Sequence, residues 1–90
     1  MSDDPFPIVG ALDLPRADEL EPGLLAFAEE LASDVVPVDC SGMTFIDSSG
    51  IGMLLEVRER SGKHLVLQDV PAKCRHVFKV AGLESAFLIT

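Results

Sequence analysis

Aspartate, serine and glycine meet in the Asp-Ser-Ser-Gly segment at residues 47–50, the part of this 90-residue chain best suited to chemistry. The segment precedes an apolar helical pattern, where aspartate and serine side chains can cap free backbone amides. A nucleophilic serine would also need an activating base and an oxyanion site. The Gly-x-Ser-x-Gly elbow is absent, and neither His64 nor His76 has a signature that ties it to Ser48. We therefore expect no enzymatic activity.

The remaining candidates for chemistry give weaker signals. Gly50-Ile51-Gly52 lacks the Gly-Lys-Ser/Thr that follows in a phosphate-binding loop, and such glycines more often allow a tight turn. Cys40 and Cys74 have no metal-ligand spacing, and each falls where an apolar residue would pack. We expect buried thiols there, with redox sensing or a disulfide as the alternatives. The sequence indicates no metal and no cofactor.

Acidic residues outnumber basic ones by 15 to 7, and the pI is about 4.4. Lys and Arg are needed to bind phosphates, so this balance argues against nucleic acid and anionic membranes as partners. The charge is uneven, because residues 1–47 hold eleven acids and only Arg16, whereas residues 48–90 hold four acids and six Lys and Arg. This asymmetry can steer a basic partner, although a solvated acidic surface is the simpler explanation.

The length predicts a single domain over residues 1–90. The first residues lack the positive region and apolar run of a signal peptide, and no stretch approaches the roughly 20 apolar residues of a membrane span. We therefore expect a cytoplasmic protein. Residues 1–7 precede the first apolar run and are expected to form a flexible or truncated N-terminal segment.

Apolar periodicity predicts strands that alternate with helices. Helical spacing predicts one helix up to Leu31, a second from Asp47 to Gly62 and a third from Pro71 to Gly82. Pro22 must lie in the first turn of the first helix or kink it. Short apolar runs predict strands at residues 8–12, 35–40, 64–68 and 87–89. This order is typical of an α/β fold whose mainly parallel sheet is joined by right-handed crossovers.

The most specific pattern runs from residue 38 to residue 55. A strand is followed by Ser-Gly, an apolar residue, Phe-Ile-Asp-Ser-Ser-Gly at residues 45–50, then Ile-Gly and an apolar helix. This pattern resembles the STAS domain, the fold shared by anti-sigma factor antagonists and sulfate-transporter tails. Residues 10–14 and 77–83 match as well, so the resemblance covers about residues 8–90. It implies an α/β fold with a mainly parallel sheet of four to five strands and helices packed on one face.

The resemblance also implies a function. In anti-sigma factor antagonists, the serine directly after the aspartate is phosphorylated by the partner anti-sigma factor, which is also a kinase. By match, that serine is Ser48. The chain would thus bind a switch-kinase anti-sigma factor to release a sigma factor, and a serine phosphatase would reset it. A phosphoserine brings a charge of about −1.5 to −2, so phosphorylation beside Asp47 should change the partner surface sharply.

The implied partner surface lies where strands give way to helices, and it includes residues 14–18, which we expect to form a loop. Its residues are Asp13, Leu14, Arg16, Asp47, Ser48, Ser49, Gly50 and Ile51. The family usually has a further N-terminal strand and often a C-terminal helix, which this sequence does not show. Uncovered sheet edges favour association, so we expect a monomer or a weak homodimer.

Two other interpretations of the same segment stay open. The chain also resembles a non-phosphorylated STAS accessory subunit of a lipid or solute ABC transporter, a protein that docks on the transporter's ATPase. Such proteins more often carry Asp-Thr/Ser-Ala/Gly-Gly variants, so Asp-Ser-Ser-Gly favours the antagonist. Ser48 can also be a helix cap without any regulatory role.

Overall fold

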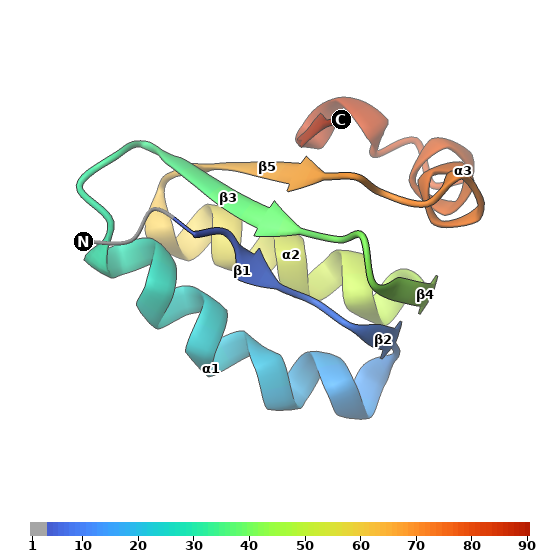
Figure 1. Ribbon diagram of the computed structural model, residues 1–90, viewed down its shortest axis with the longest axis horizontal. Helices are drawn as coiled ribbons and strands as arrows, with labels where there is room; N and C mark the ends of the chain where they lie inside the picture. Colours follow the sequence, from blue (N-terminus) through green and yellow to red (C-terminus); the bar gives the residue numbers. More distant parts are fainter. Residues whose placement is uncertain (1–3) are drawn as a thin grey trace.

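Four parallel strands form the main sheet of the structure, a computed structural model that describes residues 4–90 (Figure 1). In spatial order they are β1 (Phe6–Pro7), β3 (Val35–Asp39), β5 (His64–Gln68) and β6 (Leu88–Ile89). A second, smaller sheet pairs β2 (Gly10–Leu12) with β4 (Met43–Ile46), also in parallel. The predicted α/β class and its parallel sheet are therefore confirmed.

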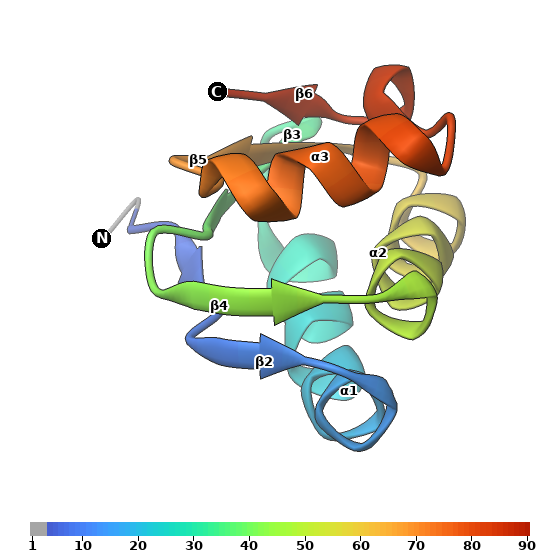
Figure 2. The ribbon, with the colours of Figure 1, turned by 90° about the vertical axis from the view of Figure 1, so that its right-hand side faces the viewer.

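Three helices and one 3-10 turn connect the strands. They are α1 (Leu14–Glu30), α2 (Ser48–Ser61), α3 (Ala72–Val80) and η1 (Glu84–Ala86). In Figure 1, α1 lies below the strands of the main sheet and α2 lies behind β3 and β1, whereas α3 lies past the carboxyl ends of β3 and β5, beside β4 (Figure 2). No helix among residues 4–90 is long and apolar enough to cross a membrane.

The first predicted strand, residues 8–12, is shorter in the structure: only Gly10–Leu12 form a strand, β2, and Ile8 and Val9 connect it to β1. Phe6 and Pro7 pair with β3, and Gly10 then turns the chain toward β4 with a φ of +88°, a conformation that glycine adopts readily. The Phe6 ring packs against Phe27 of α1, with ring centroids 5.6 Å apart. Residues 1–3 lie outside the described part, but Phe6–Pro7 belong to the sheet rather than to a flexible segment, and β1 supplies an N-terminal strand that the sequence did not reveal.

Helix α1 begins earlier than its apolar spacing predicted. Asp13 caps it by accepting a hydrogen bond from the Arg16 amide at 3.2 Å, and Pro15 lies in the first turn, where its missing N–H costs nothing. Residues 14–18 are therefore helical, and the predicted loop is wrong. Pro22 lies inside the helix rather than in its first turn.

The core fills the space between the main sheet and the pair α1 and α2. Val36 and Val38 of β3, and Leu65 and Leu67 of β5, are fully buried, while the alternate residues of both strands face outward. This alternation follows from the two-residue period of a strand. Leu24 and Leu54 are the fully buried leucines that α1 and α2 contribute. The helices thereby fix the sheet from one side.

Lys63, in the turn between α2 and β5, ties that turn to the end of α1. Its Nζ donates to the Ala28 carbonyl oxygen at 2.6 Å and to the Leu31 carbonyl oxygen. Carbonyls at a helix end lack intrahelical partners and carry partial negative charge, so an ammonium group is well placed there. This contact couples the two helices at the end of the molecule opposite their first turns.

Replacing Lys63 with methionine should lower the free energy of unfolding by about 1–3 kcal/mol, because two carbonyls would lose charge-assisted hydrogen bonds. Chemical denaturation monitored by circular dichroism measures the change. The exposed Lys73 on α3 provides the control, since Lys73→Met should change stability by less than about 0.5 kcal/mol. Equal effects of the two substitutions would show that the Lys63 contacts do not stabilise the fold.

Candidate functional site

Two strand-to-helix turns, residues 12–14 and 46–48, lie side by side at one end of the molecule. Strands β2 and β4 pair with Leu12 opposite Ile46, and each strand leads directly into a helix (Figure 2). Asp13 follows Leu12 and caps α1, while Asp47 follows Ile46 and caps α2. The register therefore brings both aspartate caps, and the first turns of both helices, to the same edge.

Ser48 is the first residue of α2 and is exposed. The Asp47 carboxylate accepts hydrogen bonds from the amides of Ser49 at 2.9 Å and Gly50 at 3.2 Å. Two of the amides that a phosphate at this helix start would seek are thus already bonded to a carboxylate. These two amides are therefore not free to neutralise a negative charge added at Ser48.

Gly50 allows α2 to approach β2 closely. A Cβ at this position would lie 2.6 Å from the Leu12 carbonyl oxygen and 2.9 Å from Ile46 Cγ1. Contacts below 3.0 Å require the backbone to move, so only glycine fits without distortion. Gly52, two residues further along the same helix, has open space around it. The glycine at residue 50 is therefore a structural requirement of the turn.

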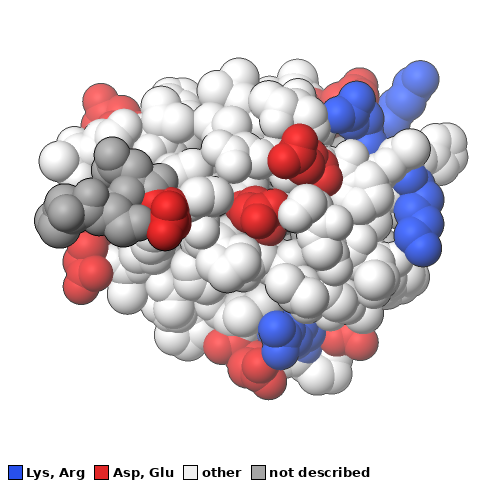
Figure 3. Space-filling model, viewed as in Figure 1, with Lys and Arg blue, Asp and Glu red and all other residues white. Residues whose placement is uncertain are grey.

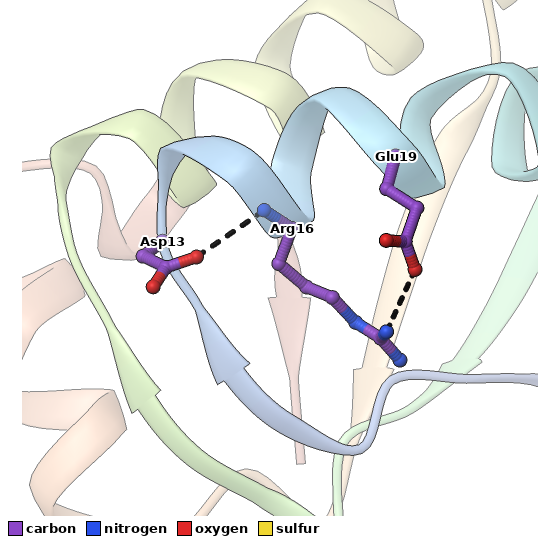
Figure 4. Close-up of polar contacts among 3 residues, drawn as sticks. All are labelled: Asp13, Arg16 and Glu19. Carbon is purple, nitrogen blue, oxygen red and sulfur yellow. Dashed lines mark hydrogen bonds and ion pairs between the residues drawn. The ribbon is translucent and has the colours of Figure 1, made fainter.

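Arg16 is held along α1 by its neighbours (Figure 4). Its amide donates to Asp13, and its Nη1 lies 2.8 Å from Glu19 Oε1 in an ion pair. Its Nε is buried and has no hydrogen-bond partner within residues 4–90. The guanidinium group is half-exposed and remains available to a partner at the edge of the site.

The residues predicted for the partner surface differ in their exposure. Leu14 is 57% exposed and Ser48 is exposed as well, while Asp13, Arg16, Asp47 and Ser49 are half-buried. Gly50 and Ile51 are buried. These last two support the turn from within, and the surface that a partner can touch consists of the other six.

Two exposed apolar residues extend this surface beyond the predicted set. Phe45 in β4 is 49% exposed, and Val80 on α3 is 71% exposed. Val80 lines a cavity of about 420 Å³ together with Ser48, Ile51, His76, Val77 and Ala81. The buried face of α3 includes Cys74 and Phe78, and Val80 lies outside it. An apolar residue outside the buried face of a helix is the sequence signal that could have predicted this part of the surface.

Charge is distributed unevenly around the site. Several Lys and Arg side chains lie at the right-hand end of the molecule in Figure 3, where Figure 1 places α3, and most charged side chains in the rest of that view are acidic. Helix α3 carries Lys73, Arg75, His76 and Lys79 and no acidic residue. The site at Ser48 thus lies between the acidic start of the chain and a basic helix.

Cys40 and Cys74 are buried free thiols. Desolvation and the nearby Asp39 raise the pKa of Cys40 to about 12, and desolvation raises the pKa of Cys74 as well. Redox-active cysteines need the thiolate and access to solvent, so these surroundings do not favour the predicted redox role. Within residues 4–90, no three His, Cys, Asp or Glu side chains gather as a group that could hold a metal ion.

Comparison with known proteins places this arrangement in a family. A family model described as "Mlab, STAS domain" matches residues 6–90. The chain therefore belongs to the STAS domain family. The solved structure of the anti-sigma factor antagonist SpoIIAA in its unphosphorylated form has a TM-score of 0.70 with this chain at 21% sequence identity, and the match covers 93% of this chain and 76% of that one. The two proteins share a fold.

Gly50→Ala should destabilise the protein by about 2 kcal/mol or more, since its methyl group meets the Leu12 carbonyl oxygen. Gly52→Ala is the matched control on the same helix. It should leave stability unchanged or raise it by up to about 1 kcal/mol, because alanine favours helix and the space is open. Thermal and denaturant unfolding of both variants measures the difference, and two similar effects would contradict the close approach of α2 to β2.

The cysteines provide a second test. With the pKa of Cys40 raised to about 12 from 9.0, its thiolate fraction at neutral pH falls roughly a thousandfold. Ellman's reagent should therefore label the folded protein far more slowly than the protein unfolded in guanidinium chloride. Rapid labelling of the folded protein would instead support redox sensing, the alternative to buried thiols.

Proposed function

We propose that the chain is an anti-sigma factor antagonist. It binds an anti-sigma factor that is also a serine kinase, frees a sigma factor, and loses its partner when Ser48 is phosphorylated. A serine phosphatase restores the binding form. The observation that carries this proposal is the position of Ser48, exposed at the start of α2 and surrounded by apolar side chains that suit a protein contact.

The surroundings of Ser48 support a switch that works by charge. Phosphorylation within an apolar contact disrupts it, since the phosphate must lose its hydration. The bonds from Ser49 and Gly50 to the Asp47 carboxylate leave few free donors to compensate for the phosphate. The partner therefore meets a negative charge that the capped amides do not neutralise, on the surface that it contacts. The proposed role is binding, and no residue is assigned to catalysis.

Ser48→Asp should weaken binding to the kinase by at least about tenfold, whereas Ser48→Ala should retain it. Purified protein is incubated with ATP and each candidate anti-sigma kinase of the same genome, phosphate is located by mass spectrometry, and affinities are measured by isothermal titration calorimetry. Phosphate should appear on Ser48 of the wild-type protein and be missing from Ser48→Ala.

Ser49 supplies the matched control, because it is the neighbouring serine and is half-buried. Ser49→Ala should be phosphorylated normally. Absence of phosphate on Ser48 with all candidate kinases, or equal affinity of Ser48→Asp and Ser48→Ala, would overturn the charge switch.

A second candidate is an accessory subunit of a lipid or solute ABC transporter that docks on the ATPase without phosphorylation. The apolar cavity beside Ser48 supports it, since such a contact needs no charge at Ser48. The two functions differ in two results. For the accessory subunit, a purified transporter ATPase should bind tightly, and no kinase should modify Ser48.

A further inference from the structure

We infer that α3 and the first turn of α2 hold a partner segment by two adjacent anchors, an apolar side chain and a carboxylate. The apolar side chain enters the cavity beside Ser48, and the carboxylate lies against the basic residues of α3. This inference rests on the proposed function, in which Ser48 faces a partner protein, and it specifies the chemistry that the partner presents there.

Two cavities lie next to each other along α3 and share His76. The first, the Ser48 cavity, has a volume of about 420 Å³ and is lined mainly by aliphatic side chains, among them Val77, Val80 and Ala81. The second, the basic cavity, has a volume of about 380 Å³ and lies toward η1. Its lining residues are Val70, Ala72, Arg75, His76, Lys79 and Glu84.

The Ser48 cavity suits an apolar side chain. Val80 at its edge is 71% exposed, although it is the kind of residue that folding normally buries. Leu14, at the start of α1, and Phe45, in the strand β4 that leads to Ser48, are also well exposed. An exposed apolar patch with polar residues at its rim is typical of a protein contact.

The basic cavity determines the charge of the partner. Arg75 is positioned there by the hydrogen bond from its Nη2 to the Thr90 carbonyl oxygen at 2.9 Å, and Lys79 makes no ion pair within residues 4–90. Glu84 is the single carboxylate among the lining residues. Basic residues therefore predominate, and charge complementarity favours an acidic group on the partner.

The shared position of His76 means that one short segment can reach both cavities. Such a segment places an apolar residue next to one or two acidic residues. A phosphate on Ser48 would then stand at the wall of the first cavity and repel the acidic residues of the segment, in addition to excluding its apolar side chain. Both anchors are weakened by the same modification.

A peptide titration of the full chain tests the inference without the kinase. The probe is the capped hexapeptide acetyl-Glu-Leu-Glu-Glu-Leu-Glu-amide, added to the 15N-labelled protein while amide shifts are recorded by NMR. The amides of Ser48 and of residues 76–81 should shift together and saturate. Probes with Ala in place of Leu, or Lys in place of Glu, should bind at least about tenfold more weakly.

Two variants locate the anchors on the protein. Val80→Glu and Lys79→Glu should each weaken the hexapeptide by about tenfold or more, and both residues are exposed, so the fold should tolerate the changes. Val35→Glu is the matched control, because Val35 is an exposed valine at the amino end of β3, away from α3. The Val35→Glu protein should bind the hexapeptide as tightly as the wild type does.

Several results would overturn the inference. They are the absence of saturable shifts at millimolar peptide, equal binding of the Lys and Glu probes, unchanged binding of Val80→Glu and Lys79→Glu, and equal shifts caused by inorganic phosphate alone. Failure of Ser48 phosphorylation with intact peptide binding would remove the proposed switch and keep the two anchors. Normal phosphorylation without peptide binding would keep the proposed switch and overturn the two anchors.

Discussion

The close approach of Gly50 to the Leu12 carbonyl oxygen is the contact on which the site depends. Because residue 50 has no side chain, α2 begins against β2, and the pairing of Leu12 with Ile46 sets the two aspartate caps beside each other. Asp47 then holds the first amides of α2, and Ser48 is left exposed at the corner. A larger residue at position 50 would displace the helix start that presents Ser48.

Much of the fold is readable from local signals. Asp47 and Gly62 mark the ends of α2 correctly, and Gly62 ends it in the left-handed conformation, with a φ of +69°. The positions of β3 and β5 and the parallel sheet also follow from the sequence. The helix ends and strand positions depend on residues that are close in the chain, and the parallel order follows from the alternation of strands with helices.

The errors had two sources: contacts that are distant in sequence and, at the start of α1, local capping signals that apolar spacing does not include. Phe6–Pro7 is too short to show a strand period, and it is recognisable only through its pairing with β3. The start of α1 at Leu14 depends on the Asp13 cap and Pro15, signals that a search for apolar spacing passes over. The cavity beside Ser48 is lined jointly by the first turn of α2 and by α3, and no single segment encodes it. Single-segment patterns identify the phosphorylation candidate but miss the surface around it.

In the proposed function, Ser48 is a phosphorylation switch at the fixed start of α2. The turn is fixed by a tight backbone contact and by two capping bonds, so a phosphate there changes the charge of the surface rather than the packing beneath it. The apolar side chains around Ser48 and the basic residues of α3 then determine how strongly a partner responds. In this proposal the fold determines the position of Ser48, and phosphorylation changes only the charge there.

The most direct measurement of this claim compares the amide NMR spectra of the unmodified protein and of protein with phosphoserine incorporated at position 48. The account predicts shift changes confined to the first turns of α1 and α2 and to the facing residues of α3, with β3 and β5 unchanged. Changes that spread through the main sheet would contradict it, because phosphorylation would then act by rearranging the fold.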